Sequence, residues 1–239
     1  MSRARFDASQ LRITRGALII AGLLIGVSLV FMLSPKDTQA QFSSWLVAWP
    51  SGVYRSGRVW TLATSVLIEH DFLALLLDLF MLWAFIPQLE RFWGMSRFFR
   101  FFAVTSLAGT VVGTLAGLAL GSETPIAGIS PFVFAATVAF GIVYAKQPVQ
   151  FFGVLPLTGR QLMYGFIGFV AVFILLTQEW EKGASFAAAM LAAAVMTSRR
   201  FSPALAWKRW RIARARARLS VLEGGAPRPP RKRDERYLN

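Results

Sequence analysis

The chain has 239 residues, of which 55% are hydrophobic and 14% aromatic, and its mean hydropathy is +0.51. Only 16% of the residues are charged, against about 25% in a typical soluble domain, and they gather at the two ends and at a few internal breaks. Long apolar runs between those breaks exclude an ordinary soluble domain and favour an all-α membrane protein. With no cysteine and one histidine, His70, disulfides and thiolate or His-rich metal sites are excluded, and we expect no cofactor and no metal.

The first long apolar run, Ala17 to Leu33, follows a basic segment, residues 1–16, that contains four arginines. A cleaved signal peptide has the same order of features, and residues 38–40 resemble a weak cleavage site. The run is longer than the usual core of a signal peptide, so we favour a retained first transmembrane helix. The next stretch, residues 34–60, is too broken to span a bilayer, and its tryptophans suit a segment at the membrane interface.

Five further apolar segments follow in chain order. They run from about Leu62 to Ile86, Phe98 to Leu120, Pro125 to Ala145, Gln161 to Thr177 and Ala184 to Met196. Residues 69–71 are polar and interrupt the first of these five, so its membrane-buried part could begin only near Phe72. Together with the first run, the segments predict six transmembrane helices within residues 17–198.

The distribution of Lys and Arg predicts the orientation of these helices. With the N-terminus inside, 22 of the 26 Lys and Arg residues fall in inner segments. The outer segments hold the other four, which are Lys36, Arg55, Arg58 and Lys182. Cytoplasmic loops of membrane proteins carry an excess of Lys and Arg, so both termini are predicted to be cytoplasmic.

Small residues recur on one face of the third and of the sixth predicted helix. They are Gly109, Gly113, Gly117 and Gly121 on the third helix, and Ser185, Ala188 and Ala192 on the sixth. Such faces let helix backbones approach closely, because lipid gives no hydrophobic reason for helices to associate. Packing within one protomer is the favoured interpretation, and homodimerisation is the alternative.

The basic tail, residues 199–239, has two parts. Residues 204–222 place six Lys and Arg residues among apolar and aromatic ones, which predicts an amphipathic helix on the inner membrane surface, bound to anionic lipid. Residues 226–239 are rich in Pro and Arg and are predicted to be disordered. Nucleic-acid binding is an alternative use of the positive charge, but we consider it unlikely, because a basic tail beside a span usually sets topology.

Three stretches between about Val53 and Val195 resemble the rhomboid family of intramembrane serine proteases and their inactive relatives. The first, SGRVWTLATS at residues 56–65, is similar to the family's Trp-Arg-Leu-x-Thr entry to the second span, with Trp60 retained and Thr61 where Arg is usual. The second, LERFWGMSRF at residues 89–98, closely matches the family's Glu-x-x-Trp-Gly-x-x-Arg-Phe junction between spans two and three. Its matching residues are Glu90, Arg91, Trp93, Gly94 and Arg97.

The third stretch, Gly128-Ile129-Ser130-Pro131, stands about five residues into span four, at the place of the family's Gly-x-Ser-Gly nucleophile motif. The resemblance implies a six-transmembrane-helix rhomboid-like bundle in which polar residues of spans two, four and six meet in the outer half of the membrane. In active members Ser is the nucleophile, a His on span six is its base, and a His and an Asn on span two hold the oxyanion.

Carrying these roles over residue by residue predicts an inactive protein. Ser185 stands at the position of the basic His, and a hydroxyl cannot act as a general base near neutral pH. Ala74 and Asp78 stand at the positions of the oxyanion His and Asn, and an ionised Asp would repel an oxyanion. Pro131 replaces the Gly after the nucleophile and removes a backbone donor. The motif thus keeps Ser130 only as a vestigial nucleophile.

Two groups could replace the missing base. His70 lies two helical turns before Asp78, near the outer surface and away from the span-six position, and Asp78 itself could accept a proton. Neither restores an oxyanion pocket. Because a carboxyl group within a span normally has a partner, we expect Asp78 to hydrogen-bond Ser130 or Ser185 and to hold the former active-site cavity closed.

We therefore predict a non-proteolytic rhomboid-like protein that binds transmembrane helices of client proteins, or locally perturbs the bilayer, and so affects their stability or trafficking. One alternative is an active intramembrane serine endopeptidase that uses Ser130 with an atypical base. The other is a structural membrane module whose basic tail binds lipid or a soluble partner. We expect the protein in a bacterial inner (cell) membrane.

Overall fold

The computed structural model describes residues 13–151, 155–198, 211, 212 and 214. The chain divides into two compact units, residues 1–198 and 199–239, and every helix and strand with defined bounds belongs to the first. Within the predicted surface helix 204–222, the three described residues are helical. The rest of that helix, the predicted disordered stretch 226–239 and the basic residues 1–12 lie outside the described residues.

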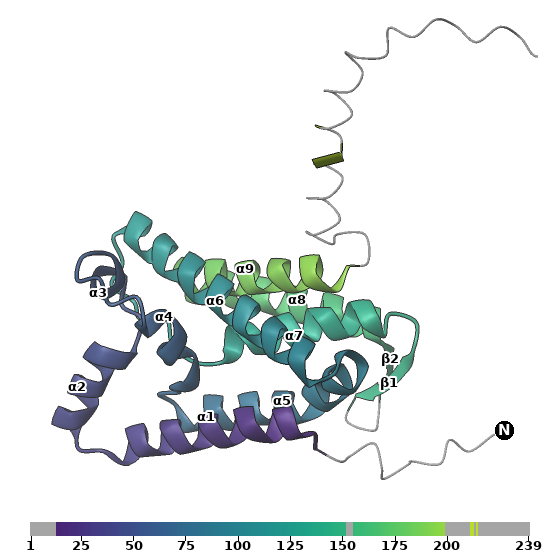
Figure 1. Cartoon of the computed structure of the whole chain (residues 1–239), viewed down its shortest axis with the longest axis horizontal. Helices are drawn as coiled ribbons and strands as arrows, with labels where there is room; N and C mark the ends of the chain where they lie inside the picture. The colour runs from purple at the N-terminus through teal and green to yellow at the C-terminus, as the bar shows by residue number, and fades with distance from the viewer. Residues whose placement is uncertain (1–12, 152–154, 199–210, 213, 215–239) are drawn as a thin grey trace, which may run out of the picture. The chain divides into compact units, whose positions relative to one another are not determined.

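The described part of the first unit is mostly helical (Figure 1). In chain order its elements are α1 (Arg15–Leu33), α2 (Lys36–Leu46), α3 (Pro50–Tyr54), α4 (Thr61–Thr64), the 3-10 helix η2 (Ser65–Leu67), α5 (Phe72–Trp93), α6 (Met95–Leu120), α7 (Ser130–Val143), β1 (Pro148–Phe151), β2 (Leu155–Thr158), α8 (Gly159–Thr177) and α9 (Trp180–Thr197). Helices α1 and α5 pack side by side, and α9 packs along both α6 and α7.

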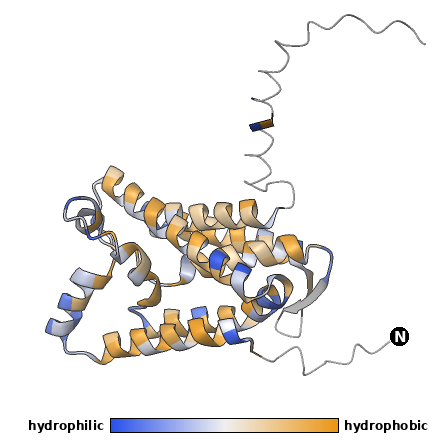
Figure 2. Cartoon of the chain, in the orientation of Figure 1, coloured by the Kyte–Doolittle hydropathy of each residue, from blue (hydrophilic) through white to orange (hydrophobic). Residues whose placement is uncertain are grey.

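Four of the described helices, α1, α5, α6 and α8, are long and apolar enough to cross a membrane, with mean hydropathies between 1.7 and 2.6. Helix α7 is apolar but has 14 residues, a rise of about 21 Å. In the four long helices less than half of each apolar window is buried, and Figure 2 shows that these helices consist mostly of hydrophobic residues, so apolar side chains are exposed along them. Lipid has to cover a surface of this kind, and the predicted class of multi-pass α-helical membrane protein is confirmed at that level.

Two helix starts and one helix end differ from the sequence-based ones by five residues or more, the end being that of α5, which continues past Ile86 to Trp93. The second apolar segment was predicted from Leu62, but α4, η2 and an irregular break at residues 68–71 precede α5, so the start near Phe72 is the correct one. Asp71 fixes that start, because its side chain accepts hydrogen bonds from the backbone N–H groups of Leu73 (2.6 Å) and Ala74 (3.3 Å). Helix α7 begins at Ser130 and not near Pro125, so Ser130 is its first residue.

The loop between the fourth and fifth apolar segments contains a hairpin that was not predicted. Strands β1 and β2 pair antiparallel, with Pro148 opposite Thr158 and Phe151 opposite Leu155. Thr158 then begins α8 through a capping box: its hydroxyl accepts from the Gln161 backbone N–H (3.3 Å), and the Gln161 side chain accepts from the Thr158 N–H (2.9 Å). The hairpin therefore sets where α8 starts.

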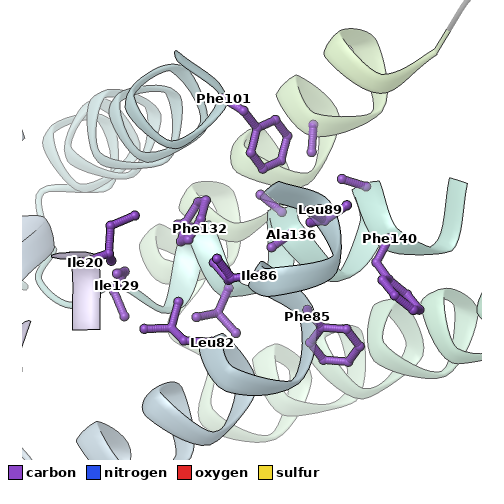
Figure 3. Packing of buried hydrophobic residues seen from close by; sticks show 14 of the residues in the cluster. Ile20, Leu82, Phe85, Ile86, Leu89, Phe101, Ile129, Phe132, Ala136 and Phe140 are labelled. Carbon is purple, nitrogen blue, oxygen red and sulfur yellow. The ribbon is translucent and has the colours of Figure 1, made fainter. Parts of the chain in front are cut away.

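Helix α7 lies in the core of the first unit. It contacts α5, α6, α8 and α9, and its buried residues occur on all sides of the helix. Figure 3 shows Phe132 and Phe140 of α7 among side chains from other helices, with Ile20 from α1 and Phe101 from α6. The Phe132 ring lies 4.8 Å from that of Phe102. A helix that is apolar on all sides belongs in a protein interior. The packing around α7 also holds its first residue, Ser130, in place.

The glycine face of α6 packs within the chain. A Cβ on Gly113 would lie 2.8 Å from Ser185 Cβ on α9, and one on Gly109 would lie 3.2 Å from Ser185 Oγ. A Cβ on Gly117 would lie similarly close to the Pro50 side chain, and Gly121 ends α6 at a φ of +67°. The backbones of α6 and α9 therefore approach closely where glycine leaves room, as the intramolecular interpretation of the small-residue faces requires.

A carboxylate of α5 caps the N-terminus of α1. Thr14 precedes α1 but its side chain makes no cap; instead Glu90 accepts hydrogen bonds from the backbone N–H groups of Gly16 (2.9 Å) and Ala17 (3.0 Å) and from the Thr14 hydroxyl. Glu90 is buried, with 7% of its surface exposed. Helix N-termini carry unpaired donors and partial positive charge, so this carboxylate binds α1 to α5.

The remaining residues of the sequence motifs lie at the junction between α5 and α6 and just before α4. Gly94 joins α5 to α6 at a φ of +76°, and the Trp93 ring lies 4.8 Å from that of Phe101. Arg91 and Arg97 are exposed beside this junction. Trp60 donates from Nε1 to the Trp45 carbonyl at 3.0 Å.

Candidate functional site

The N-terminus of α7 and the first third of α5 meet at a hydrogen bond. The hydroxyl of Ser130 donates to Asp78 Oδ2 at 2.9 Å, which confirms the expected bond between these side chains. Asp78 is six residues into α5, about 9 Å of helix rise, and only 7% of it is exposed. The pair therefore lies below the end of the bundle at which α5 begins.

Loop contacts place Ser130 at this depth. Two residues earlier, Gly128 has a φ of +90° and donates its N–H to the Ser65 carbonyl at 3.0 Å. Ile126 donates to the Ala48 carbonyl at 3.0 Å. Positive φ favours glycine, so Gly128 lets the loop turn sharply into α7. Pro131 follows as the second residue of the helix, where its missing N–H is tolerated.

Ser185 of α9 is near this pair but is not bonded to it. Its side chain is 1% exposed, and its Oγ has no hydrogen-bond partner among the described residues. It faces the α6 glycines, and it lines the same cavity as Ser130 and Ala74. The structure thus brings Ala74, Asp78, Ser130 and Ser185 to one region, and only Asp78 and Ser130 share a hydrogen bond.

Two adjoining cavities surround the pair. The first, which we call the apolar chamber, has a volume of about 430 Å³, and among its described lining residues Asp78 and Ser130 alone have polar side chains. It is lined by Ala74, Leu77, Asp78 and Met81 of α5, Ser130, Val133 and Phe134 of α7, Phe166, Phe169, Val170 and Phe173 of α8, and Phe186 of α9. Leu77, Phe169 and Phe173 are also exposed on the outer surface, so the apolar chamber opens between α5 and α8.

The second cavity, the polar chamber, has a volume of about 220 Å³ and contains the charged groups near the start of α5 and of α9. Lys182 forms an ion pair with Glu179 at 2.7 Å. Glu69 lines the same chamber, and its Oε2 is buried with no hydrogen-bond partner among the described residues. Burial, and secondarily the charge of Asp78, raise the pKa of Glu69 to about 7. From the sequence, Glu69 was only part of a polar interruption of the second apolar segment, and Lys182 only a basic residue of an outer segment. The sequence did not place them in one cavity, because their proximity depends on tertiary packing.

Glu69→Gln is expected to stabilise the protein at pH 8 by about 2 kcal/mol and to have little effect at pH 5. Because the folded state holds the Glu69 proton more tightly, native stability falls as pH rises from about 4.5 to about 7 and is lowest above that range. Thermal unfolding in detergent at both pH values measures the difference. Asp37→Asn, which changes an exposed carboxylate on α2, is the control. An equal gain at both pH values would contradict the prediction.

His70 does not join the site. Its ring contacts Phe31 of α1 edge-on, with centroids 4.8 Å apart, and it lines neither chamber. Burial lowers its pKa. Within the described residues no group of three or more His, Cys, Asp or Glu side chains could hold a metal ion. The polar chemistry of the chambers is thus that of carboxylates, hydroxyls and one ammonium group.

Ser130→Ala is expected to lower the free energy of unfolding by about 2 kcal/mol, because the buried Asp78 carboxyl loses its donor. Asp78→Leu is expected to destabilise as well, and the double variant should lose less than the sum of the two. Thermal unfolding of the two single variants and the double variant in detergent completes this double-mutant cycle. Additive losses would show that the two groups do not act together, and an unchanged or higher stability of Asp78→Leu would rule out its structural role.

The span-length helices, the apolar outer surface and a polar pair within it define an integral membrane protein. A family described as "Eukaryotic integral membrane protein (DUF1751)" matches residues 17–198, and the chain belongs to this family. A comparison with curated proteins gave no match. The family description concerns eukaryotic proteins and gives no support to the expected bacterial inner membrane.

Proposed function

We propose that this protein is a non-proteolytic, rhomboid-like membrane protein that binds transmembrane helices of client proteins at the opening between α5 and α8. In this proposal α1 and α5 to α9 all cross the membrane, and both termini are cytoplasmic. The observation that carries it is the Ser130–Asp78 hydrogen bond in the lining of a cavity open to lipid.

Charge at the two ends of the bundle supports this topology. Two hydrogen bonds show that the start of α1 and the ends of α5 and α7 lie at the same end of the bundle. Glu90 accepts from the Gly16 N–H, and Tyr144 Oη donates to the Gln88 carbonyl at 3.2 Å. The basic residues at that end are Arg15, Arg91, Arg97, Arg100, Lys146 and Arg160. The opposite end has four basic residues, Lys36, Arg55, Arg58 and Lys182, beside six carboxylates, those of Asp37, Glu69, Asp71, Glu123, Glu179 and Glu181. The excess of Lys and Arg at the inner end follows the positive-inside rule.

The surroundings of Ser130 favour a role without proteolysis. A serine protease needs a base beside the hydroxyl and donors that hold the oxyanion. Here Ser130 donates to a carboxylate that stands where a donor would be needed, and Pro131 contributes no N–H. The chain's single imidazole packs on Phe31 instead. Asp78 can accept the Ser130 proton, but its negative charge opposes the charge that acyl transfer would create.

The same cavity suits the binding of another helix. Helices associate in membranes through close packing and hydrogen bonds, since burial of apolar surface gives little drive there. The opening between α5 and α8 offers aromatic side chains, among them Phe169 and Phe173, above a buried hydroxyl–carboxyl pair. A client helix can pack on these aromatic side chains and place a polar side chain in hydrogen-bond contact with Ser130 or Asp78.

A fluorophosphonate probe tests the non-proteolytic part of the proposal. The purified protein in detergent is expected to be labelled no more than Ser130→Ala, because Asp78, which stands where an oxyanion donor would be needed, opposes the negative charge that forms at phosphorus. An active rhomboid protease treated in parallel controls for the probe. Labelling that disappears in Ser130→Ala would establish an activated serine and favour the protease alternative.

Photo-crosslinking in membranes tests client binding. A photoreactive residue at Phe169, which lines the opening, is expected to form adducts with other membrane proteins. Val172, on the same helix and exposed but outside the cavity lining, is the matched control. Identical adducts from both positions would contradict a client site here. Loss of all adducts on removal of residues 199–239 would favour the tail as the binding element.

A further inference from the structure

The two chambers adjoin, and one is polar and the other apolar. Ala74, Ser130, Phe173 and Phe186 line both of them. The polar chamber lies by the start of α5, and the apolar chamber extends from it past Asp78 to Met81, along the helix. An occupant that fills both must therefore carry a polar group at one end and an apolar chain at the other.

The polar chamber has unused hydrogen-bonding groups and an excess of negative charge. Among its described lining residues are two carboxylates, Glu69 and Glu179, and one ammonium group, Lys182, which Glu179 already binds. Glu69 Oε2 and Ser185 Oγ are buried without partners, and Ser185 is 99% buried. Buried polar atoms are rarely left unpaired, and a small shift of either side chain toward the chamber would let it bind a group that the protein alone does not supply. A hydrogen-bond donor with positive charge satisfies a free carboxylate oxygen best.

The apolar chamber has the size of a small-molecule site. Its volume of about 430 Å³ falls within the range of roughly 300–1,000 Å³ that ligand pockets occupy. An α-helix with side chains is about 10–12 Å across and is too wide to enter it, whereas a hydrocarbon chain is not. The opening at Leu77, Phe169 and Phe173 faces the surface that lipid covers, so a lipid chain can enter sideways from the bilayer.

We propose that this two-chambered cavity binds a membrane lipid whose amine-bearing head group lies in the polar chamber, against Glu69 and Ser185, with one acyl chain in the apolar chamber. Lys182 lies at the same end and can bind the phosphate of such a head group. The lipid and a client helix use this cavity in turn: a client helix that lies across the opening and bonds Ser130 or Asp78 displaces the acyl chain from the apolar chamber.

Photoactivatable lipids in vesicles test the proposal with the full-length protein. The probes are phosphatidylethanolamine and phosphatidylglycerol that carry the same diazirine acyl chain, each added in trace amount to phosphatidylcholine vesicles. We expect phosphatidylethanolamine to label peptides containing Met81, Phe166 and Phe173 about fivefold more than phosphatidylglycerol does, the effect of one favourable charge pair. Equal labelling by the two lipids would overturn the proposed head-group recognition.

Variants separate a cavity lipid from lipid around the protein. Glu69→Gln is expected to remove the preference for phosphatidylethanolamine, and Asp37→Asn to preserve it. Ala74→Trp fills the junction of the chambers and should abolish cavity labelling, whereas Ala171→Trp, exposed on α8 outside the lining, should not. Labelling that survives both Ala74→Trp and Glu69→Gln would show surrounding lipid only. Crosslinks to a second copy of the chain in place of lipid would also overturn the proposal. Because these vesicles contain no other protein, the result does not depend on client binding.

Discussion

Glu90→Ala is expected to lower the free energy of unfolding by about 4 kcal/mol and to release α1 from α5. The substitution removes the acceptor of three donors: the Gly16 and Ala17 N–H groups and the Thr14 hydroxyl. Each buried donor left without a partner costs about 1–3 kcal/mol, and the positive end of the α1 dipole loses its counter-charge. Thermal unfolding in detergent measures the stability, and hydrogen exchange of the Gly16 and Ala17 amides shows whether the first turn of α1 opens.

Glu123→Ala is the matched control for this prediction. Glu123 also accepts two hydrogen bonds near a helix start, from the Ser51 N–H at 3.3 Å and the Ser51 hydroxyl at 2.8 Å, but these bonds are exposed. Water replaces the lost acceptor there, so the expected loss is below about 1 kcal/mol. If both substitutions destabilise equally, the buried cap has no special role in holding α1.

Gly113→Ala is expected to destabilise the protein by about 3 kcal/mol, a large effect for one methyl group. The added Cβ would lie 2.8 Å from Ser185 Cβ and 3.3 Å from the Glu181 carbonyl oxygen, so α6 and α9 must move apart. Thermal unfolding in detergent measures the loss. Ser185→Gly removes the atom that the new methyl group meets, so the double variant should recover much of the stability.

Gly165→Ala is expected to change the stability in the opposite direction, and it controls for the effect of replacing a glycine by an alanine. Apart from the nearby backbone of α8 itself, no atom of the described residues lies within 4 Å of a Cβ at this position, so the substitution is expected to stabilise slightly through better helix propensity. A loss for Gly113→Ala that Ser185→Gly does not reduce would contradict the assigned contact. Equal effects at Gly113 and Gly165 would show that close packing of α6 on α9 contributes nothing.

The sequence predicted those features of the fold that repeat along the chain. Apolar runs located the helices, because a membrane helix is apolar over most of its length. The glycine spacing located the close-packed face of α6, and the motif around Ser130 led to its hydrogen bond with Asp78. The short strands β1 and β2 were missed, since four residues with Pro148 in one and Pro156 in the other show no clear alternation.

The parts of the site that were not predicted depend on residues far apart in the chain. Glu90 and Gly16 are separated by 74 positions, and no local pattern marks a carboxylate that will cap another helix. Glu69, just before α5, and Lys182, in α9, line one chamber although 113 positions separate them. The position of Ser130 was misjudged because Gly128 turns the chain sharply at positive φ, and the apolar residues before it therefore belong to a loop.

The cap on α1 has a consequence for biosynthesis. The ribosome delivers the first turn of α1 well before Glu90, so the nascent helix begins with donors that have no partner in the chain made so far. Those donors need water or lipid head groups until α5 is complete and its far end arrives beside them. Firm attachment of α1 to α5 is therefore a late step of membrane insertion, completed only after synthesis has passed the junction between α5 and α6.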